Sequence, residues 1–324
     1  MRIKVGAGKT VDMTLSTPLH ASRMWYADDE MQFGAVLSSD GEGLKQPVHH
    51  DPNDPNAHLS WNFVEFTFTP QGTLNADISY VDFTGKAASI ELTSRDGTTQ
   101  SVQGVRPGSV DTICEALGVQ EKADGRPWKA LCMAGDDGRP VRVLAPLHHP
   151  NKPSFSTYWD KYVDRVWSRF SHETLTINTQ SQAGNVECRV SGHHLSCEGD
   201  NKSYSKPTAR DIWGCAAGPF QAIEGDNGVH RVVIPRLCAA FVRSTLLQDI
   251  LPPGNSFITP RFGQAHYYQH ETTNHYGRLV HECQIDGKGY AFAYDDVNPG
   301  SENAAGAVGS ETPDRLTVTF GVKS

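Results

Sequence analysis

The chain has 324 residues and a formal net charge of −8, with 20% charged and 38% hydrophobic residues. This length is sufficient for two medium-sized domains with apolar cores. The acidic balance and the lack of any Lys and Arg cluster argue against a nucleic-acid partner, because affinity for phosphate depends on such clusters. No run of about 18 apolar residues occurs, so we expect no membrane-spanning helix.

The first hundred residues are rich in β-branched and aromatic side chains, which predicts strands. We expect these strands at residues 3–11, 22–27, 32–37, 63–68, 76–83 and 88–93. Three carboxylates lie on two neighbouring strands: Glu65 on the first, and Asp77 and Asp82 on the second. Charged side chains are rarely buried unless paired, so such acids face solvent or oppose one another across a cleft. Opposed carboxylates are the chemistry of glycoside hydrolysis, which needs a proton donor and a base or nucleophile.

The register of these two strands decides which carboxylates meet. If Phe68 pairs with Leu74 across the turn, Glu65 lies opposite Asp77. Asp82 then falls on the other face, because side chains alternate along a strand. A bulge or bend between Asp77 and Asp82 is needed to bring Asp82 into the cleft. Two pairs stay open: Glu65 with Asp82, and Glu65 with Asp77.

Helical patterns begin near Gly108. We expect helices at 110–117, at 128–133, at 156–170 and from Pro235 to about 251, with a strand at 175–180. In 156–170 the aromatic residues recur at three- and four-residue spacing, which is typical of a core-facing stripe. Tyr158 and Trp159, near the start of this helix, are the candidates for ligand contact instead.

Strand character returns after Pro253. We expect strands at residues 264–269, 278–284, 289–294 and 315–320. Because neighbouring strands complete one another's hydrogen bonds, the two ends of the chain are interpreted as one barrel or sandwich. Residues 1–104 and 254–324 would form this β domain, and residues 105–253 a mixed α/β domain inserted between them.

The seven cysteines favour an oxidising environment and hence a secreted protein, although the start of the chain lacks the apolar core of a signal peptide. A tight turn at Gly192 and His193 would place Cys188 opposite Cys197, which predicts a disulfide. Pairing of Cys114 with Cys132 and of Cys215 with Cys238 is a weaker expectation, and Cys283 is the odd thiol.

Other polar clusters predict no metal site. His266, His270, His275 and His281 lie close in sequence, but their spacing on predicted strands does not converge on one ion. The acidic runs at residues 28–30 and 295–296 lack the spacing of a calcium loop. We therefore expect neither a metal nor a cofactor; Asp295 or Asp296 remains a candidate to line a groove, since this block follows a predicted strand.

Several blocks along the chain resemble, in order, the pattern of glycoside hydrolase family 64, the endo-β-1,3-glucanases related in fold to thaumatin-like proteins. The blocks are 63–68 (FVEFTF), 76–83 (ADISYVDF), 158–164 (YWDKYVD), 188–192 (CRVSG), 235–241 (PRLCAAF) and 290–299 (YAFAYDDVNP). The resemblance covers nearly the whole chain. Seven cysteines and a long α/β insertion fit the glucanases better than the densely cross-linked thaumatin-like proteins.

The resemblance implies a mainly β protein with an α/β insertion: a thaumatin-like barrel or sandwich, a mixed domain, and a wide groove between them. It implies an inverting endo-β-1,3-glucanase with Glu65 as general acid and Asp82 as general base. The candidate substrate contacts are Thr67, Thr69, Asp77, Ser79, Tyr158, Trp159 and Asp296. The expected partner of this monomer is β-1,3-glucan, with no nucleic acid and no membrane; the alternative is a non-catalytic, thaumatin-like β-glucan-binding protein.

Overall fold

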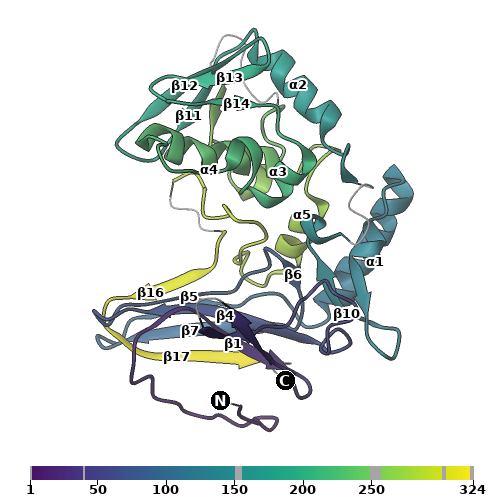
Figure 1. The fold of residues 1–324 in the computed structure, drawn as a ribbon, viewed down its shortest axis with the longest axis vertical. Coiled ribbons are helices and arrows are strands. Elements are labelled where there is room, and N and C mark those ends of the chain that lie inside the picture. Colours follow the sequence, from purple (N-terminus) through teal and green to yellow (C-terminus); the bar gives the residue numbers. More distant parts are fainter. Residues whose placement is uncertain (1, 39–40, 150–154, 249–256, 301–303, 322–324) are drawn as a thin grey trace.

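The computed structural model describes residues 2–38, 41–149, 155–248, 257–300 and 304–321. Figure 1 shows two lobes, with sheets formed by both ends of the chain in the lower one and helices α2, α3 and α4 in the upper one. None of the helices in these ranges is long and apolar enough to cross a membrane.

Two open sheets build the lower lobe from both ends of the chain. The first has the order β1-β4-β5-β16, with β1 at Leu19–Ala27, β4 at Trp61–Phe68, β5 at Leu74–Asp77 and β16 at Ala307–Ser310. The second has the order β17-β7-β8, with β17 at Pro313–Phe320, β7 at Ala88–Ser94 and β8 at Thr99–Val102. β16 pairs with β5 and β17 with β7, which confirms that the chain ends complete one another's sheets (Figure 1). A separate hairpin joins β2 (Gly34–Ser38) and β3 (Gly41–Lys45).

The alternation of side chains explains how the two sheets share a core. Val64, Leu74 and Ala76 point from the first sheet into the interior, and Ile90 and Leu92 point inward from the second. Glu65 belongs to the opposite face of β4, because its side chain alternates with the buried Val64 and Phe66. Glu65 and its cross-strand neighbour Asp77 therefore lie on the face that points away from the sandwich core.

The middle of the chain adds two sheets and most of the helices. One sheet has the order β6-β10-β9 (Phe83–Thr84, Pro140–Leu144, Cys132–Ala134). The other has the order β14-β13-β12-β11-β15 (Ser203–Ser205, His194–Cys197, Asn185–Ser191, Leu175–Asn178, Phe257–Thr259). The five α-helices of the described ranges are α1 (Ser109–Asp124), α2 (Asp160–Phe170), α3 (Ala209–Gly214), α4 (Gly228–Val242) and α5 (His275–Cys283).

The division into domains stays a prediction, and two strand pairings cross its expected boundaries. The boundary between residues 253 and 254 lies outside the described residues, but β15 pairs with β11, so the sheet of the middle segment extends to Thr259. β10 pairs with β6, and Figure 1 places α1 and β10 beside the lower lobe. The first part of the predicted insertion therefore packs with the β domain.

Several predicted elements differ from the structure. The described strands form open sheets, and a closed barrel is not found among them. Residues 278–284, predicted as a strand, lie almost entirely in α5, and residues 264–266 form a short 3-10 helix. Pro235 lies inside α4 and does not begin it. Residues 289–294 contribute a single bridge at Tyr290, and residues 3–11 form no strand.

Three disulfides join Cys114 to Cys132, Cys188 to Cys197 and Cys215 to Cys238. All three predicted pairs are confirmed, and the remaining Cys283 is a buried free thiol. Cys188 and Cys197 face each other across the antiparallel pair β12 and β13, as the hairpin argument required.

Candidate active site

A row of half-buried charged side chains crosses the face of the first sheet that points away from the sandwich core. Glu65 on β4 pairs with Arg23 on β1 and with Asp77 on β5, so the predicted register of Glu65 opposite Asp77 is confirmed. Arg23 Nε donates to Glu65 Oε1 at 2.9 Å, and its guanidinium lies 4.4 Å above the ring of Phe63. Glu65 is thus held between a cation and a second carboxyl group.

The chain bends between Asp77 and Asp82. β5 ends at Asp77, Tyr80 N donates to the carbonyl of Tyr290 at 2.7 Å, and a bend follows at residues 81 and 82. The next two residues form β6 and pair with β10 of another sheet. This bend is the feature that the register argument required, and it takes Asp82 off the alternation of β5.

Asp82 lies against histidines from two loops. His148 Nε2 donates to Asp82 Oδ1 at 2.9 Å, and Ala145 N donates to the backbone carbonyl of Asp82 at 2.9 Å. The hydrogen bond from His148 lowers the pKa of Asp82 below its ordinary value; burial opposes it, and His49, His148 and Arg23 add to the lowering. Asp82 is therefore ionised at neutral pH.

Asp77 has the opposite shift. Burial, together with the negative charge of Glu65, raises the pKa of Asp77 to about 7. Asp77 consequently carries a proton in weakly acidic solution, directly across the strand pair from Glu65. Two carboxyl groups whose surroundings shift their pKa values apart are typical of an acid and a base in one site.

Phe63 shares a face of β4 with Glu65, two residues away along the strand. Its ring lies 4.9 Å from that of Trp25 and 5.9 Å from that of Phe83, measured between centroids. Phe66 and Phe68 alternate to the other face of β4, so Phe63 is the phenylalanine of this strand that lies beside Glu65.

The remaining residues predicted to bind sugar lie on β4, in the turn after it, and in the segments around Ser79 and Asp296. Thr67, on the same face as Glu65, accepts a hydrogen bond from Ala21 N at 3.1 Å. Thr69 accepts from Thr73 N at 3.1 Å and so closes the turn between β4 and β5. Ser79 is half-buried and forms a bridge with Tyr290. Asp296 is exposed. Burial of Tyr290 raises the pKa of its hydroxyl, and the negative charges of Asp296 and Asp77 add to this shift.

Tyr158 and Trp159 are part of the core. Trp159 has no exposed surface and Tyr158 retains 9%. The Tyr158 hydroxyl donates to Thr273 O at 3.0 Å and accepts from Thr273 N at 3.2 Å. Both rings pack against Trp213, with centroids 5.6 and 5.1 Å away. Burial argues against sugar contact, so we withdraw both residues from the binding set.

Arg23, His49 and His148 were missed by the sequence reasoning. Arg23 lies in a predicted strand, but its place opposite Glu65 depends on a pairing of distant segments. His49 and His148 come from two loops, and they meet, with ring centroids 4.4 Å apart, only in the folded chain. No local pattern marks such residues.

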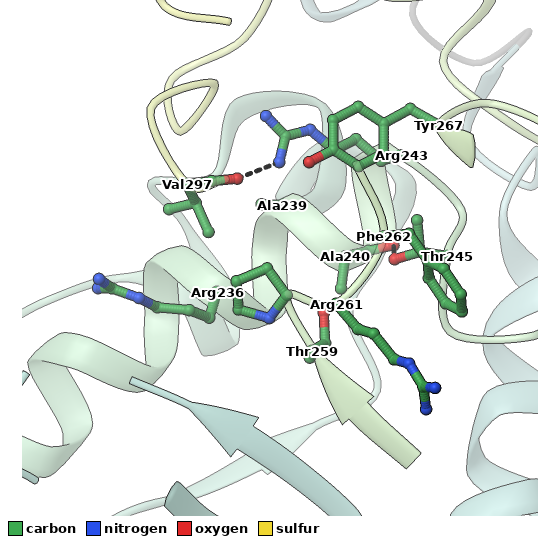
Figure 2. Close-up of a pocket in the computed structure, with 11 residues that line it drawn as sticks. Arg236, Ala239, Ala240, Arg243, Thr245, Thr259, Arg261, Phe262, Tyr267 and Val297 are labelled. Atoms are coloured by element: carbon green, nitrogen blue, oxygen red, sulfur yellow. Dashed lines mark hydrogen bonds between the residues drawn. The ribbon is translucent and has the colours of Figure 1, made fainter. Parts of the chain in front are cut away.

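Figure 2 shows a small pocket that none of the three carboxylates lines; its lining comes from α4 and the residues just after it, from the segment 259–267 and from Val297. Three arginines border it: Arg236, Arg243 and Arg261. Arg243 donates to the carbonyl of Val297 and, at 3.0 Å, to Asp295 Oδ1, so its charge is engaged within the fold. We assign this pocket a structural role.

Comparison with known proteins agrees with the fold. The sequence profile of glycoside hydrolase family 64, described as beta-1,3-glucanase, matches residues 1–320. A glucan endo-1,3-beta-glucosidase of Cellulosimicrobium cellulans is 28% identical over 294 residues, which are 88% of this chain and 50% of the relative. A second of the same name, from Arthrobacter sp. (strain YCWD3), has the same identity and coverage. The chain spans about half the length of these curated relatives.

Solved structures are also similar. A laminaripentaose-producing beta-1,3-glucanase in complex with laminaritetraose superimposes with a TM-score of 0.77 at 28% identity, covering 93% of this chain and 78% of that one. A beta-1,3-glucanase domain from Clostridium beijerinckii has the same fold, with a TM-score of 0.71 at 20% identity over 93% of this chain and 75% of its own. With the family profile matching nearly its full length, this chain belongs to glycoside hydrolase family 64.

Proposed function

We propose that the protein is an endo-acting β-1,3-glucanase that inverts the anomeric centre, with Glu65 as general acid and Asp82 as general base. The observation that carries the proposal is the contrast between its carboxyl groups. Asp77, paired with Glu65, holds a proton up to a pH of about 7, whereas Asp82 is kept ionised by His148. A non-catalytic glucan-binding protein needs no such contrast.

The proposed chemistry follows from these environments. Cleavage of the acetal passes through an oxocarbenium-like state, which needs a proton on the leaving oxygen and an activated water behind C1. The proton that Asp77 holds in weakly acidic solution passes to Glu65 opposite it, and Glu65 delivers it to the leaving oxygen. Asp82 removes a proton from the water, and His148 holds its carboxylate in place. Inversion requires about 6.5 to 9.5 Å between the two carboxyl groups so that the water fits.

We place the substrate in a groove between the thaumatin-like sandwich and the upper lobe. Support comes from the row of Glu65 and Asp77, which lies on the sheet face opposite the sandwich core. Thr67, Thr69, Ser79 and Asp296 would contact the sugar from this side and from the segment around Tyr290. The names of the relatives support β-1,3-glucan as the polymer.

We further propose that the protein is secreted and works as a monomer. Three disulfides suit an oxidising compartment and are uncommon in the cytosol.

The test is hydrolysis of laminarin by the wild type and by Glu65→Gln and Asp82→Asn. We expect the wild type to release oligosaccharides and each variant to lose at least about a hundredfold in kcat, since general acid and base catalysis contribute on that order. Glu91→Gln, on the exposed side of β7, is the matched control and should keep full activity. An inactive wild type that still binds laminarin would instead support the non-catalytic alternative.

Proton NMR of the freshly released reducing end tests the stereochemistry. An inverting enzyme acting on a β-linkage releases the α anomer first. Initial appearance of the β anomer would refute the assignment of Asp82 as a base that activates water.

A further inference from the structure

Three imidazoles gather beside Asp82. His49 and His50 lie in the loop between β3 and β4, and His148 ends a short 3-10 helix (Pro146–His148) after β10. One ring nitrogen of each lies within 4.8 Å of the other two, and His49 Nε2 and His50 Nδ1 are 3.4 Å apart. None of the four C-terminal histidines considered from the sequence belongs to this group.

The two loops that carry the imidazoles are fixed by the same strand. Arg142 of β10 is fully buried and donates to the backbone carbonyl of His49 at 3.2 Å, and also to those of Asn56, Ala57 and Leu59. His148 follows this strand by a few residues, and its N–H donates to Ala145 O at 2.9 Å. The ring of His49 stacks on Phe83, with centroids 5.2 Å apart. The imidazoles are therefore held together before any ligand arrives.

Their spacing suits a tetrahedral ion. With metal–nitrogen bonds of about 2.0 to 2.1 Å, the nitrogens around a tetrahedral Zn²⁺ lie about 3.3 Å apart. His49 and His50 already have this separation, and small side-chain rotations bring in His148. Imidazole favours ions such as Zn²⁺, Co²⁺ and Cu²⁺ over Mg²⁺ and Ca²⁺. His50 is exposed, so an ion can reach the group from solvent.

We propose that His49, His50 and His148 form a binding site for a divalent transition-metal ion, and that a bound ion inhibits the enzyme by engaging Asp82. If His148 binds through Nε2, Asp82 loses its hydrogen bond and faces the cation instead. If His148 binds through Nδ1, Asp82 becomes the carboxylate behind a metal-bound imidazole. Both arrangements hold the carboxylate against a cation and remove its ability to accept a proton from water. The inhibition, but not the binding, rests on the proposed function.

The first experiment measures binding alone. Co²⁺ and Zn²⁺ are titrated into the full chain, with the visible d–d absorption of Co²⁺ and calorimetry for Zn²⁺ as readouts. We expect one ion per chain. The affinity of His50→Ala should be at least about tenfold lower, since even the loss of a partner in the outer shell of a metal site costs that much. His193→Ala, from the exposed His193 and His194 pair at the β12–β13 turn, is the matched control and should bind like the wild type. Equal affinity of His50→Ala and the wild type, or no saturable binding, would overturn the site.

The second experiment compares laminarin hydrolysis with and without Zn²⁺ for each protein. The wild type and His193→Ala should lose activity with a midpoint equal to the binding constant and regain it with EDTA, while His50→Ala should need about ten times more Zn²⁺. Binding without inhibition would overturn the coupling to Asp82. A chain that binds Co²⁺ but shows no activity on any β-1,3-glucan would refute the proposed function and leave the metal site intact.

Discussion

Asp77 is the carboxyl group that holds a proton opposite Glu65. Its pKa, raised to about 7 by burial and by Glu65, predicts that kcat/KM falls as pH rises through neutrality, because Asp77 then loses the proton that it passes to Glu65. In Asp77→Asn the repulsion between the two carboxylates is gone while Arg23 still pairs with Glu65. We expect the alkaline limb of the pH profile to move to lower pH by about one unit or more. The measurement is kcat/KM against pH in buffer with EDTA.

The same variant separates the two carboxylate pairs left open by the sequence. If Asp77 itself donates the proton, Asp77→Asn will be as inactive as Glu65→Gln at every pH. If Asp77 only supplies a proton to Glu65, activity survives in acid. An unchanged alkaline limb would show that Asp77 has no part in the protonation of the site.

His148 sets the acidic limb. Its hydrogen bond lowers the pKa of Asp82, so the base works at pH values above that lowered pKa and fails as pH falls through it. In His148→Ala the pKa of Asp82 rises, and the acidic limb should move to higher pH. We expect a larger loss of kcat at pH 5 than at pH 7, with partial rescue by His148→Gln, whose amide can still donate. Equal losses at both pH values would indicate a purely structural role.

At the scale of elements, the segment 82–86 must pass close over the start of β4. A Cβ added to Gly85 would lie 2.3 Å from the carbonyl oxygen of Trp61, so this backbone must shift in Gly85→Ala. We expect a loss of about 2 kcal/mol or more in the free energy of unfolding, and a larger drop in kcat than in affinity, because Asp82 moves. Gly228→Ala, where an added Cβ meets no atom within 4 Å, is the control and should unfold like the wild type in urea. Equal stability of the two variants would contradict this account.

The elements that were predicted well are those whose signals are local. The alternation in β4 and β7 and the turn at Gly192 determined strands and a disulfide without help from the rest of the chain. The start of α4 was mispredicted for two reasons. The helix is buried on most sides, so its apolar residues show little helical period. Pro235 suggested a first helical position, whereas Asn227 is the N-cap. Tertiary packing accounts for the other elements that were mispredicted.

The candidate site shows the same limit. Glu65 and Asp77 followed from alternation and turn length, which are local properties. The bend at Asp82 depends on the pairing of β6 with β10, some sixty residues later, and on the N–H of Ala145. The histidines that tune Asp82 come from loops that no periodic pattern marks. The register argument therefore predicted that a bend was needed between Asp77 and Asp82. The segments that produce this bend, β10 and Ala145, come beside it only in the folded chain.

At the scale of the whole molecule, a buried ion pair fastens α4 to the C-terminal segment that leads back to the lower lobe (Figure 1). Arg243, directly after α4, donates to Asp295 Oδ1 at 3.0 Å, and Asp295 Oδ2 accepts from Ala291 N at 2.6 Å and contacts His281 at 3.1 Å. Burial raises the pKa of Asp295, but His281 and Arg243 outweigh it and hold that pKa below its ordinary value.

Asp295→Asn leaves the Arg243 charge buried without its counter-ion. Breaking such a pair costs about 3 to 5 kcal/mol, so we expect a much lower urea midpoint, while Asp296→Asn, at the exposed neighbouring position, should change stability by less than about 0.5 kcal/mol. Because the folded pKa is lowered, the contribution of Asp295 is present above the ordinary aspartate pKa and is lost as pH falls through the folded value. The difference between wild type and Asp295→Asn should therefore shrink in strong acid, and a difference that is the same at pH 7 and pH 2 would show that packing, and not charge, holds the two parts together.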